Sequence, residues 1–102
     1  MTPSFVLTPL ASRDMEEIFE YVLEHSGPDR AIHVHKSLHE GMSMVGAEPG
    51  VGHIRDDLGD ESLRVFSVFS FLVIYRPETR PVQVIAVVHG ARDMPAAIED
   101  RY

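Results

Sequence analysis

The C-terminal part of the chain alternates apolar runs with short turns, a pattern that predicts consecutive β-strands. Residues 63–93 contain the runs LRVFSV, FLVIYR and VQVIAVVHGARD, which are rich in Val, Ile, Phe and Tyr. The spacers, Phe69-Ser70 and PETRP, are long enough only for hairpins, so the strands should form an antiparallel meander. In the last strand, strict alternation predicts one face of Val82, Val84, Ala86 and Val88 and an opposite face of Gln83, Ile85, Val87 and His89. Both faces are mostly apolar, so the N-terminal half of the chain must cover the sheet.

The N-terminal half predicts a short strand followed by two helices. Residues 4–7 are a candidate edge strand, after which Thr8 suits a helix N-cap and Pro9 the first helical position. A first helix, ending at Ser26, would bury a stripe of Ala11, Met15, Ile18 and Val22, with Tyr21 beside it. A second helix would bury Ala31, Val34, Leu38, Met42 and Val45. Together they predict an antiparallel helical hairpin that packs on the sheet.

Glycine marks the ends and the weak points of these helices. Gly27 should end the first helix, and Ser26 with Asp29 has the spacing of a capping box for the second. Gly41 and Gly46 should weaken the second half of that second helix, where we expect fraying.

The remaining segments complete one α+β domain, residues 1–102. Residues 48–61 are rich in glycine and polar side chains, which is typical of a connecting loop. Residues 95–102 could form one or two helical turns after Asp93, or a tail. The predicted fold is a short N-terminal strand, a helical hairpin on a three-stranded meander, and a short C-terminal helix or tail.

The charge balance limits the classes of partner. The chain has 9 basic and 16 acidic residues, a formal net charge of −7, which argues against broad adhesion to nucleic acid or to anionic membranes. All the cations except Lys36 are arginines, a bias suited to defined ion pairs. The chain has no cysteine, no basic leader and no long apolar run, so we expect a soluble cytoplasmic protein.

Motifs for enzymatic chemistry are absent from the sequence. His35 and His39 have the i, i+4 spacing that can place two imidazoles on one metal, but no third ligand and no HExxH motif accompany them. There is no GxSxG elbow, no Walker loop and no GxGxxG. We therefore expect no metal site and no cofactor.

A set of arginines in the C-terminal half is the main candidate for a site. Arg55 lies in the loop, Arg64 and Arg76 lie at adjacent ends of one predicted hairpin, and Arg92 follows His89-Gly90-Ala91 at the end of the last strand. One interpretation is exposed ion pairs with Asp56, Asp57, Glu61 and Asp93. The other is a cluster that binds an anion or a partner protein, because arginine is the preferred cation at binding hot spots.

Five apolar residues lie outside the predicted helical stripes. These residues are Leu10, Phe19 and Leu23 on the first helix and Ile32 and Met44 on the second. They could complete the internal core or stand singly on the surface. Alternatively, they could line a groove that an amphipathic segment of a partner fills.

The order of the motifs along the chain resembles the ParE branch of the ParE/RelE toxin superfamily. The resemblance rests on LTPLASRDMEEIFEYV, GPDRA, EPGVGHIRDDL, LRVFSVFSFLVIYRP and VIAVVHGARD, and it covers roughly residues 5–93. It implies the small α+β toxin fold and the toxin half of a type II toxin–antitoxin pair. It also implies a ParD-like antitoxin of the ribbon-helix-helix type, with DNA contacted only through that antitoxin. ParE-type toxins are associated with inhibition of DNA gyrase, so gyrase is the implied target, acted on by binding.

Two alternatives stay open. RelE-like members are similar to ribosome-dependent mRNA endonucleases, which rely on arginines, lysines and a tyrosine after the last strand. Arg64 and Arg92 match the two arginine positions, but the only lysine is Lys36, on a helix, and Ile98 stands near the expected tyrosine. We therefore expect no catalytic residue. The second alternative is a toxin-fold protein that serves chiefly as a structural partner in a transcriptional autorepressor complex.

Overall fold

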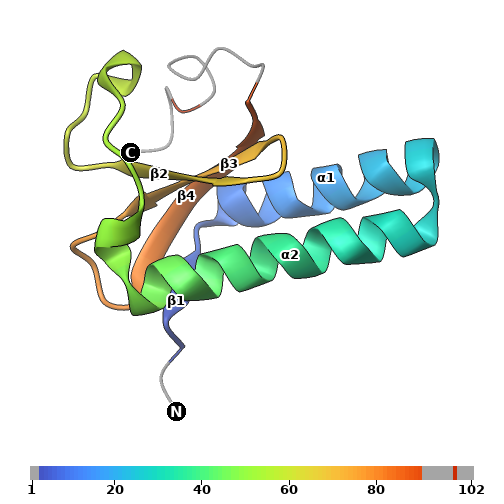
Figure 1. Ribbon diagram of the computed structural model, residues 1–102, viewed down its shortest axis with the longest axis horizontal. Coiled ribbons are helices and arrows are strands. Elements are labelled where there is room, and N and C mark those ends of the chain that lie inside the picture. Colours follow the sequence, from blue (N-terminus) through green and yellow to red (C-terminus); the bar gives the residue numbers. More distant parts are fainter. Residues whose placement is uncertain (1–2, 91–97, 99–102) are drawn as a thin grey trace.

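A computed structural model describes residues 3–90 and Ile98, and it has the α+β architecture expected from the sequence (Figure 1). The elements are β1 (Phe5–Leu7), α1 (Pro9–Ser26), α2 (Pro28–Ala47), the 3₁₀ turns η1 (Pro49–Val51) and η2 (Asp56–Leu58), β2 (Arg64–Val68), β3 (Phe71–Arg76) and β4 (Val82–His89). The two helices lie side by side on one face of the sheet. The predicted C-terminal helix or tail lies outside the described residues except for Ile98, which is helical. No described helix is long and apolar enough to cross a membrane.

The four strands form one mixed sheet in the order β1-β4-β3-β2. β2, β3 and β4 pair antiparallel, which confirms the predicted meander. β1 lies at the edge, as predicted, and runs parallel to β4 with Phe5 opposite Val82. At the other edge, the backbone of His53 bonds to Val65 of β2 in both directions, at 2.9 and 2.8 Å. This bridge occupies backbone groups that an edge strand would otherwise leave open.

Local chemistry explains where α1 begins and ends. The Thr8 hydroxyl accepts a hydrogen bond from the Ala11 N–H at 3.2 Å, which confirms the predicted N-cap. Gly27 ends α1 with a φ of 86°, a conformation that glycine adopts without a steric penalty. The predicted capping box of Ser26 and Asp29 is wrong. Ser26 remains in the last turn of α1, so Gly27 becomes the N-cap of α2 and no side chain caps that helix.

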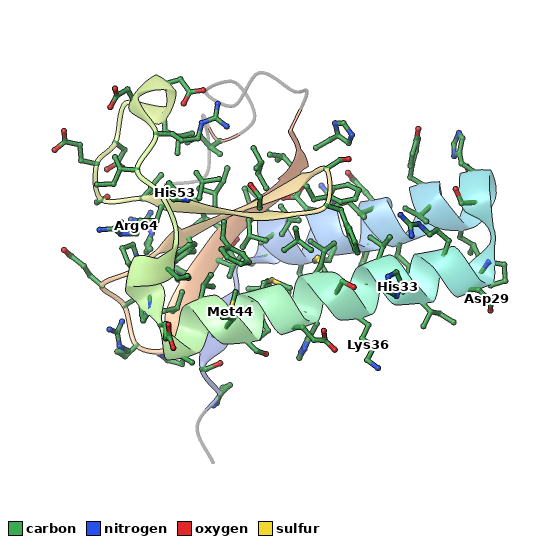
Figure 2. The ribbon with its side chains drawn as sticks, in the orientation of Figure 1. Asp29, His33, Lys36, Met44, His53 and Arg64 are labelled. Carbon is green, nitrogen blue, oxygen red and sulfur yellow. The ribbon has the colours of Figure 1, made fainter. Side chains whose placement is uncertain are left out.

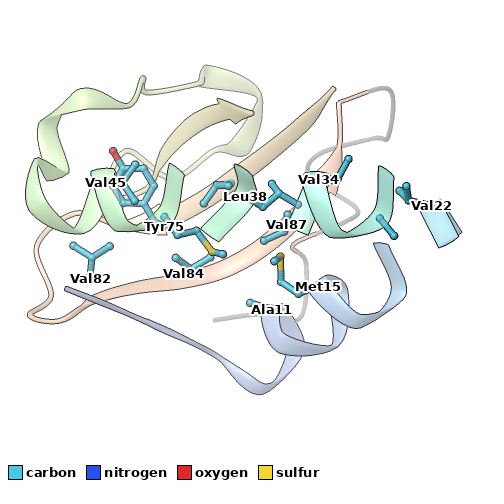
Figure 3. Close-up of a cluster of buried hydrophobic side chains, with 13 residues drawn as sticks. Ala11, Met15, Val22, Val34, Leu38, Val45, Tyr75, Val82, Val84 and Val87 are labelled. Atoms are coloured by element: carbon cyan, nitrogen blue, oxygen red, sulfur yellow. The ribbon is translucent and has the colours of Figure 1, made fainter. Parts of the chain in front are cut away.

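The larger core lies between the helices and the sheet (Figure 3). Its buried members are Ala11, Met15 and Val22 of α1, Ala31, Val34, Leu38, Met42 and Val45 of α2, and Val73, Tyr75, Val82, Val84 and Val87 of the sheet. The predicted stripe of α2 is confirmed in full, and that of α1 is confirmed with Ile18 only partly buried. Tyr21 is instead 62% exposed, because each residue turns about 100° round the helix and Tyr21 passes the edge of the stripe.

A β-bulge in β4 changes which residues face the helices. Ile74 pairs with Ala86 and Tyr75 with Val84, so Ile85 is an extra residue in β4. Beyond it the faces are exchanged: Val87 joins Val82 and Val84 under the helices, whereas Ile85, Ala86 and Val88 face a second core. The predicted faces are therefore wrong for Ala86, Val87 and Val88, because one inserted residue reverses the alternation of every residue after it.

The second core lies on the sheet face opposite the helices. Its cover comes from Leu58 of η2, from Leu63 and from Ile98, which is 2% exposed. The N-terminal half therefore covers only one face, contrary to expectation. Part of the predicted loop is ordered as η1 and η2, and it contributes to a core.

The two glycines of α2 have a packing role. The helix runs without a break to Ala47, so the expected fraying is not seen. A Cβ at Gly41 would lie 2.7 Å from the Val68 Cγ2 atom, and one at Gly46 would lie 2.6 Å from the Ser4 carbonyl oxygen. Close packing against β2 and against Ser4, just before β1, therefore offsets the low helix propensity of glycine.

Candidate binding surfaces

A groove of about 510 Å³ lies between α1 and α2. Its apolar lining is Leu7, Met15, Phe19 and Met42, and its polar lining is Ser12, Glu16, Glu20, His35 and His39. The α1 wall is acidic, whereas the α2 wall presents two imidazoles. An apolar floor between polar walls is a shape that suits an amphipathic helix. We call this surface the inter-helix groove.

The two histidines of the groove pack against aromatic rings. His35 lies edge-on to Phe19 with ring centroids 5.9 Å apart, and His39 lies edge-on to Phe5 at 5.3 Å. Within residues 3–90 and Ile98, no three His, Asp or Glu side chains are arranged to hold a metal ion. His35 and His39, one turn apart on α2, both line the groove.

The five apolar residues outside the predicted stripes do not all lie in the groove. Phe19 lines the inter-helix groove. Leu23 follows Phe19 by one turn and Ile32 precedes His35 by one turn, which places both on the same helix faces as groove residues, although neither is part of the groove lining. Leu10 lies nine residues before Phe19 on α1, and Met44 lies nine residues after His35 on α2. Nine residues are two and a half helical turns, so each lies on the side of its helix away from the groove residue. Outside the groove lining, they are 39% and 42% exposed.

The two arginine candidates nearest the loop are both bonded to it. Arg55 forms a two-point ion pair with Asp57, with Nε to Oδ1 at 3.0 Å and Nη2 to Oδ2 at 2.7 Å. Arg64 opens β2, and its Nη1 donates to the Gly52 carbonyl at 3.2 Å. Figure 2 shows Arg64 and His53 on the loop side of β2, whereas Lys36 projects away from the sheet. Arg55 therefore forms an exposed ion pair, as the first of the two interpretations expected.

The other candidates do not join them in one cluster. Arg64 pairs across the hairpin with Tyr75, so Arg76, the next residue of β3, lies on the other face of the sheet. His89 ends β4 opposite Phe71, at the far end of the hairpin, with their rings edge-on at 5.7 Å. Arg92 lies outside the described residues.

Tyr75 is a polar residue in the core that the sequence pattern did not single out. Its hydroxyl donates to the Pro49 carbonyl at 2.7 Å and accepts from the Gly52 N–H at 3.0 Å. Burial raises the pKa of this phenol, and the Gly52 hydrogen bond and the charge of Arg64 oppose that effect to a smaller extent. With both hydrogen bonds made to backbone groups, this hydroxyl anchors the loop to the sheet.

Sequence comparison over nearly the whole chain decides the family. A family model for the ParE toxin of the type II toxin–antitoxin system, parDE, matches residues 5–94. This chain belongs to the ParE toxin family. Among solved structures, one from the chromosomal ParDE toxin–antitoxin system of P. aeruginosa resembles this ParE-family chain, with 17% sequence identity and a TM-score of 0.73. The similarity covers 86% of this chain and 96% of that one, which confirms the fold. No curated protein sequence matches.

A second cavity of this ParE-family chain, of about 490 Å³, lies between α1 and the end of β4. Its lining includes Asp14, which is 7% exposed and whose Oδ2 accepts a hydrogen bond from the Val87 N–H at 2.9 Å. The bond joins α1 to β4 at Val87, which lies beyond residues 82–84, the part of β4 that pairs with β1. This contact was not predictable from the sequence, because Asp14 follows no pattern that separates it from a surface acid.

The turn between β2 and β3 of the ParE fold places an aromatic ring on the surface. Phe69 is 55% exposed and lies against Arg30 and His33 of α2. We call these three residues the hairpin-tip cluster. The sequence predicted the turn but not its contact with α2, because the two segments are far apart along the chain.

Proposed function

We propose that this ParE-family toxin is neutralised by a ParD-like antitoxin bound in the inter-helix groove, and that it inhibits DNA gyrase by binding, without chemical turnover. Family membership carries the toxin assignment. The groove is the observation that supports the mode of neutralisation. The similar P. aeruginosa structure comes from a ParDE system, which supports a ParD-type partner. A ribbon-helix-helix antitoxin would supply the DNA contacts, since the toxin's net charge of −7 disfavours direct contact with DNA.

The groove favours a helical segment that carries both apolar and basic side chains. Phe19 offers a half-buried aromatic surface, and aromatic residues dominate the energetics of many interfaces. Glu16 and Glu20 on the α1 wall would attract lysine or arginine of the partner and set its orientation.

The described residues favour binding over RNA cleavage. Cleavage requires a base for the 2′-hydroxyl and cations for the developing charge on the phosphate. Arg64 is bonded to a loop carbonyl, Tyr75 is buried and protonated, and Ile98 fills the second core near where a catalytic tyrosine is expected. These features support a toxin that acts by occupying its target.

Two assays with the purified chain test the target. We expect it to abolish supercoiling by DNA gyrase while leaving mRNA intact on ribosomes. Cleaved mRNA with normal supercoiling would instead assign the endonuclease alternative. If the chain is inactive in both assays yet binds operator DNA together with its antitoxin, the structural-partner alternative replaces this proposal.

Substitutions in the groove test the antitoxin site. Phe19→Ala should weaken antitoxin binding on the order of 30-fold, because truncating an aromatic hot spot costs about 2 kcal/mol. Glu16→Lys combined with Glu20→Lys should also weaken it, whereas Glu24→Lys, on α1 but outside the groove lining, should not. Isothermal titration calorimetry with purified antitoxin measures the affinities. Unchanged affinity for folded groove variants would place the antitoxin on another surface.

A further inference from the structure

The turn between β2 and β3 holds a bulky residue in a conformation that favours glycine. Val68 pairs with Phe71, so Phe69 and Ser70 alone form the turn, and Phe69 has a φ of 54°. Two-residue turns with a positive φ at their first position usually place glycine there, because a Cβ atom makes that conformation costly. Phenylalanine at this position therefore makes the turn less favourable than glycine would.

The side chain at this strained position lies largely on the surface. Phe69 is 55% exposed, whereas Val68 and Phe71 on either side of the turn pack against the main core. The turn itself is tied down, since the Gly90 N–H donates to the Ser70 carbonyl at 2.8 Å. The phenylalanine thus provides an apolar ring in a fixed position on the surface, which reduces the entropy lost when a partner binds.

Helix α2 holds this ring beside a positive charge. The Arg30 Cζ lies 5.5 Å from the centroid of the Phe69 ring, within the range of a cation–π contact. The His33 ring, labelled on α2 in Figure 2, lies 5.7 Å from the same centroid. In the part of the chain that the structure describes, no carboxylate forms an ion pair with Arg30. Its guanidinium group therefore keeps hydrogen-bond donors for a partner.

We propose that the hairpin-tip cluster, Arg30, His33 and Phe69, is a docking site for an acidic segment of a partner protein. A carboxylate of that segment pairs with the Arg30 guanidinium, and a neighbouring apolar side chain packs on the exposed part of the Phe69 ring. Aromatic residues and arginine are the residue types most often found at interface hot spots.

Charge decides the class of partner. The chain has a net charge of −7, so a long polyanion such as nucleic acid is repelled by most of its surface. One carboxylate needs only the local charge of Arg30. The site also differs from the inter-helix groove, whose acidic α1 wall selects basic side chains. The inference therefore does not depend on gyrase being the target or on the antitoxin's position.

An NMR titration of the isotopically labelled chain tests the proposal. The probe is a short synthetic peptide that alternates glutamate with leucine. Matched peptides carry glutamine or lysine in place of glutamate, and a single-stranded oligonucleotide represents nucleic acid. We expect the glutamate peptide alone to shift the amide resonances of Arg30, His33 and Phe69. No shift at millimolar peptide, or shifts of these amides only with the oligonucleotide, would overturn the proposal.

Two variants separate binding from folding. Phe69→Gly should weaken the binding of the glutamate peptide by about tenfold or more while the thermal midpoint stays equal or rises, because glycine relieves the turn. Arg30→Gln should weaken binding similarly, whereas Arg13→Gln, an exposed arginine of α1, should leave it unchanged. Undiminished binding by Phe69→Gly, or a lowered midpoint for that variant, would mean that the ring serves the fold alone.

Discussion

The hydroxyl group of Tyr75 joins the sheet to the segment that follows α2. It bonds to two backbone groups of that segment, at Pro49 and Gly52. A Cβ atom at Gly52 would lie 2.5 Å from the Tyr75 oxygen and 2.9 Å from the Val65 carbonyl oxygen, so only glycine fits. Because Arg64 donates to the carbonyl of the same glycine, the orientation of this arginine depends on a contact made inside the core.

Removing this hydroxyl should destabilise the fold. Tyr75→Phe should lower the free energy of unfolding by about 1–3 kcal/mol, because it leaves a buried N–H group without its acceptor. Tyr21→Phe is the matched control, since Tyr21 is 62% exposed, and it should change the stability by less than about 0.5 kcal/mol. Urea denaturation measures both. Equal midpoints for the two variants would show that the loop is held by other contacts.

The same hydroxyl predicts a loss of stability at alkaline pH. Burial raises the pKa of Tyr75 in the folded chain above its ordinary value of 10.0, at which the unfolded chain releases the proton. Above that pH the unfolded state holds fewer protons than the folded state, so the free energy of unfolding falls as the pH rises. Between about pH 8 and about pH 11, the melting temperature should fall more steeply for the natural chain than for Tyr75→Phe. Parallel curves would contradict this expectation.

Helix α2 depends on two positions where a neighbouring element comes too close for any side chain. At Gly41 the obstacle is a valine of β2, whereas at Gly46 it is the Ser4 carbonyl, which also accepts the Val82 N–H at 3.0 Å. A side chain at Gly46 would therefore push on the backbone that pairs β1 with β4. The glycines that weaken the helix locally allow it to pack closely.

Alanine substitutions at these glycines should reverse the usual effect of helix propensity. In an open helix, Gly→Ala stabilises by up to about 1 kcal/mol, but overpacking costs about 1–3 kcal/mol. Gly46→Ala should therefore destabilise the fold, and Gly41→Ala should do so to a smaller extent because a side chain can adjust. Gly50→Ala, where no atom lies within 4 Å of the added Cβ, is the control. Thermal unfolding measures the stability of each variant. If Gly46→Ala proved as stable as Gly50→Ala, the close contact between Gly46 and Ser4 would be contradicted.

Elements were predictable where their signal is local. The buried stripe of α2, the Thr8 cap and the three strands of the meander all follow from spacing along the chain, and all are confirmed. The bulge at Ile85 has no such signal, because β4 is apolar on both faces and a shift of one residue leaves its hydrophobic pattern unchanged. The packing role of Gly41 and Gly46 was also missed, since it depends on strands distant in sequence.

At the scale of the whole molecule, the two proposed surfaces have opposite chemistry. The inter-helix groove has an acidic wall, whereas the hairpin-tip cluster presents an arginine beside an aromatic ring. Residues of α2 contribute to both surfaces. The groove forms where α2 lies beside α1, whereas the cluster forms where α2 contacts the β2–β3 turn. One helix can therefore serve two partners of different charge.

The site was less predictable than the fold. The sequence singled out Leu10, Phe19, Leu23, Ile32 and Met44 as groove candidates, but it could not show that, of these five, Phe19 alone is part of the lining of the inter-helix groove. Periodicity places a residue on a helix face and does not reveal which element packs beside that face. The arginines Arg64 and Arg76 were placed at one end of a hairpin, as the register shows, yet on opposite faces of the sheet.

The pairing of β1 with β4 has a consequence during translation. Among the described strands, β1 pairs with β4 alone; β4 is the last of them to leave the ribosome and an interior strand of the sheet. A nascent chain that ends before residues 82–84 has both helices but lacks the strand on which they pack. A product that ends before β4 therefore cannot assemble the fold, so the folded toxin forms only after β4 has been translated.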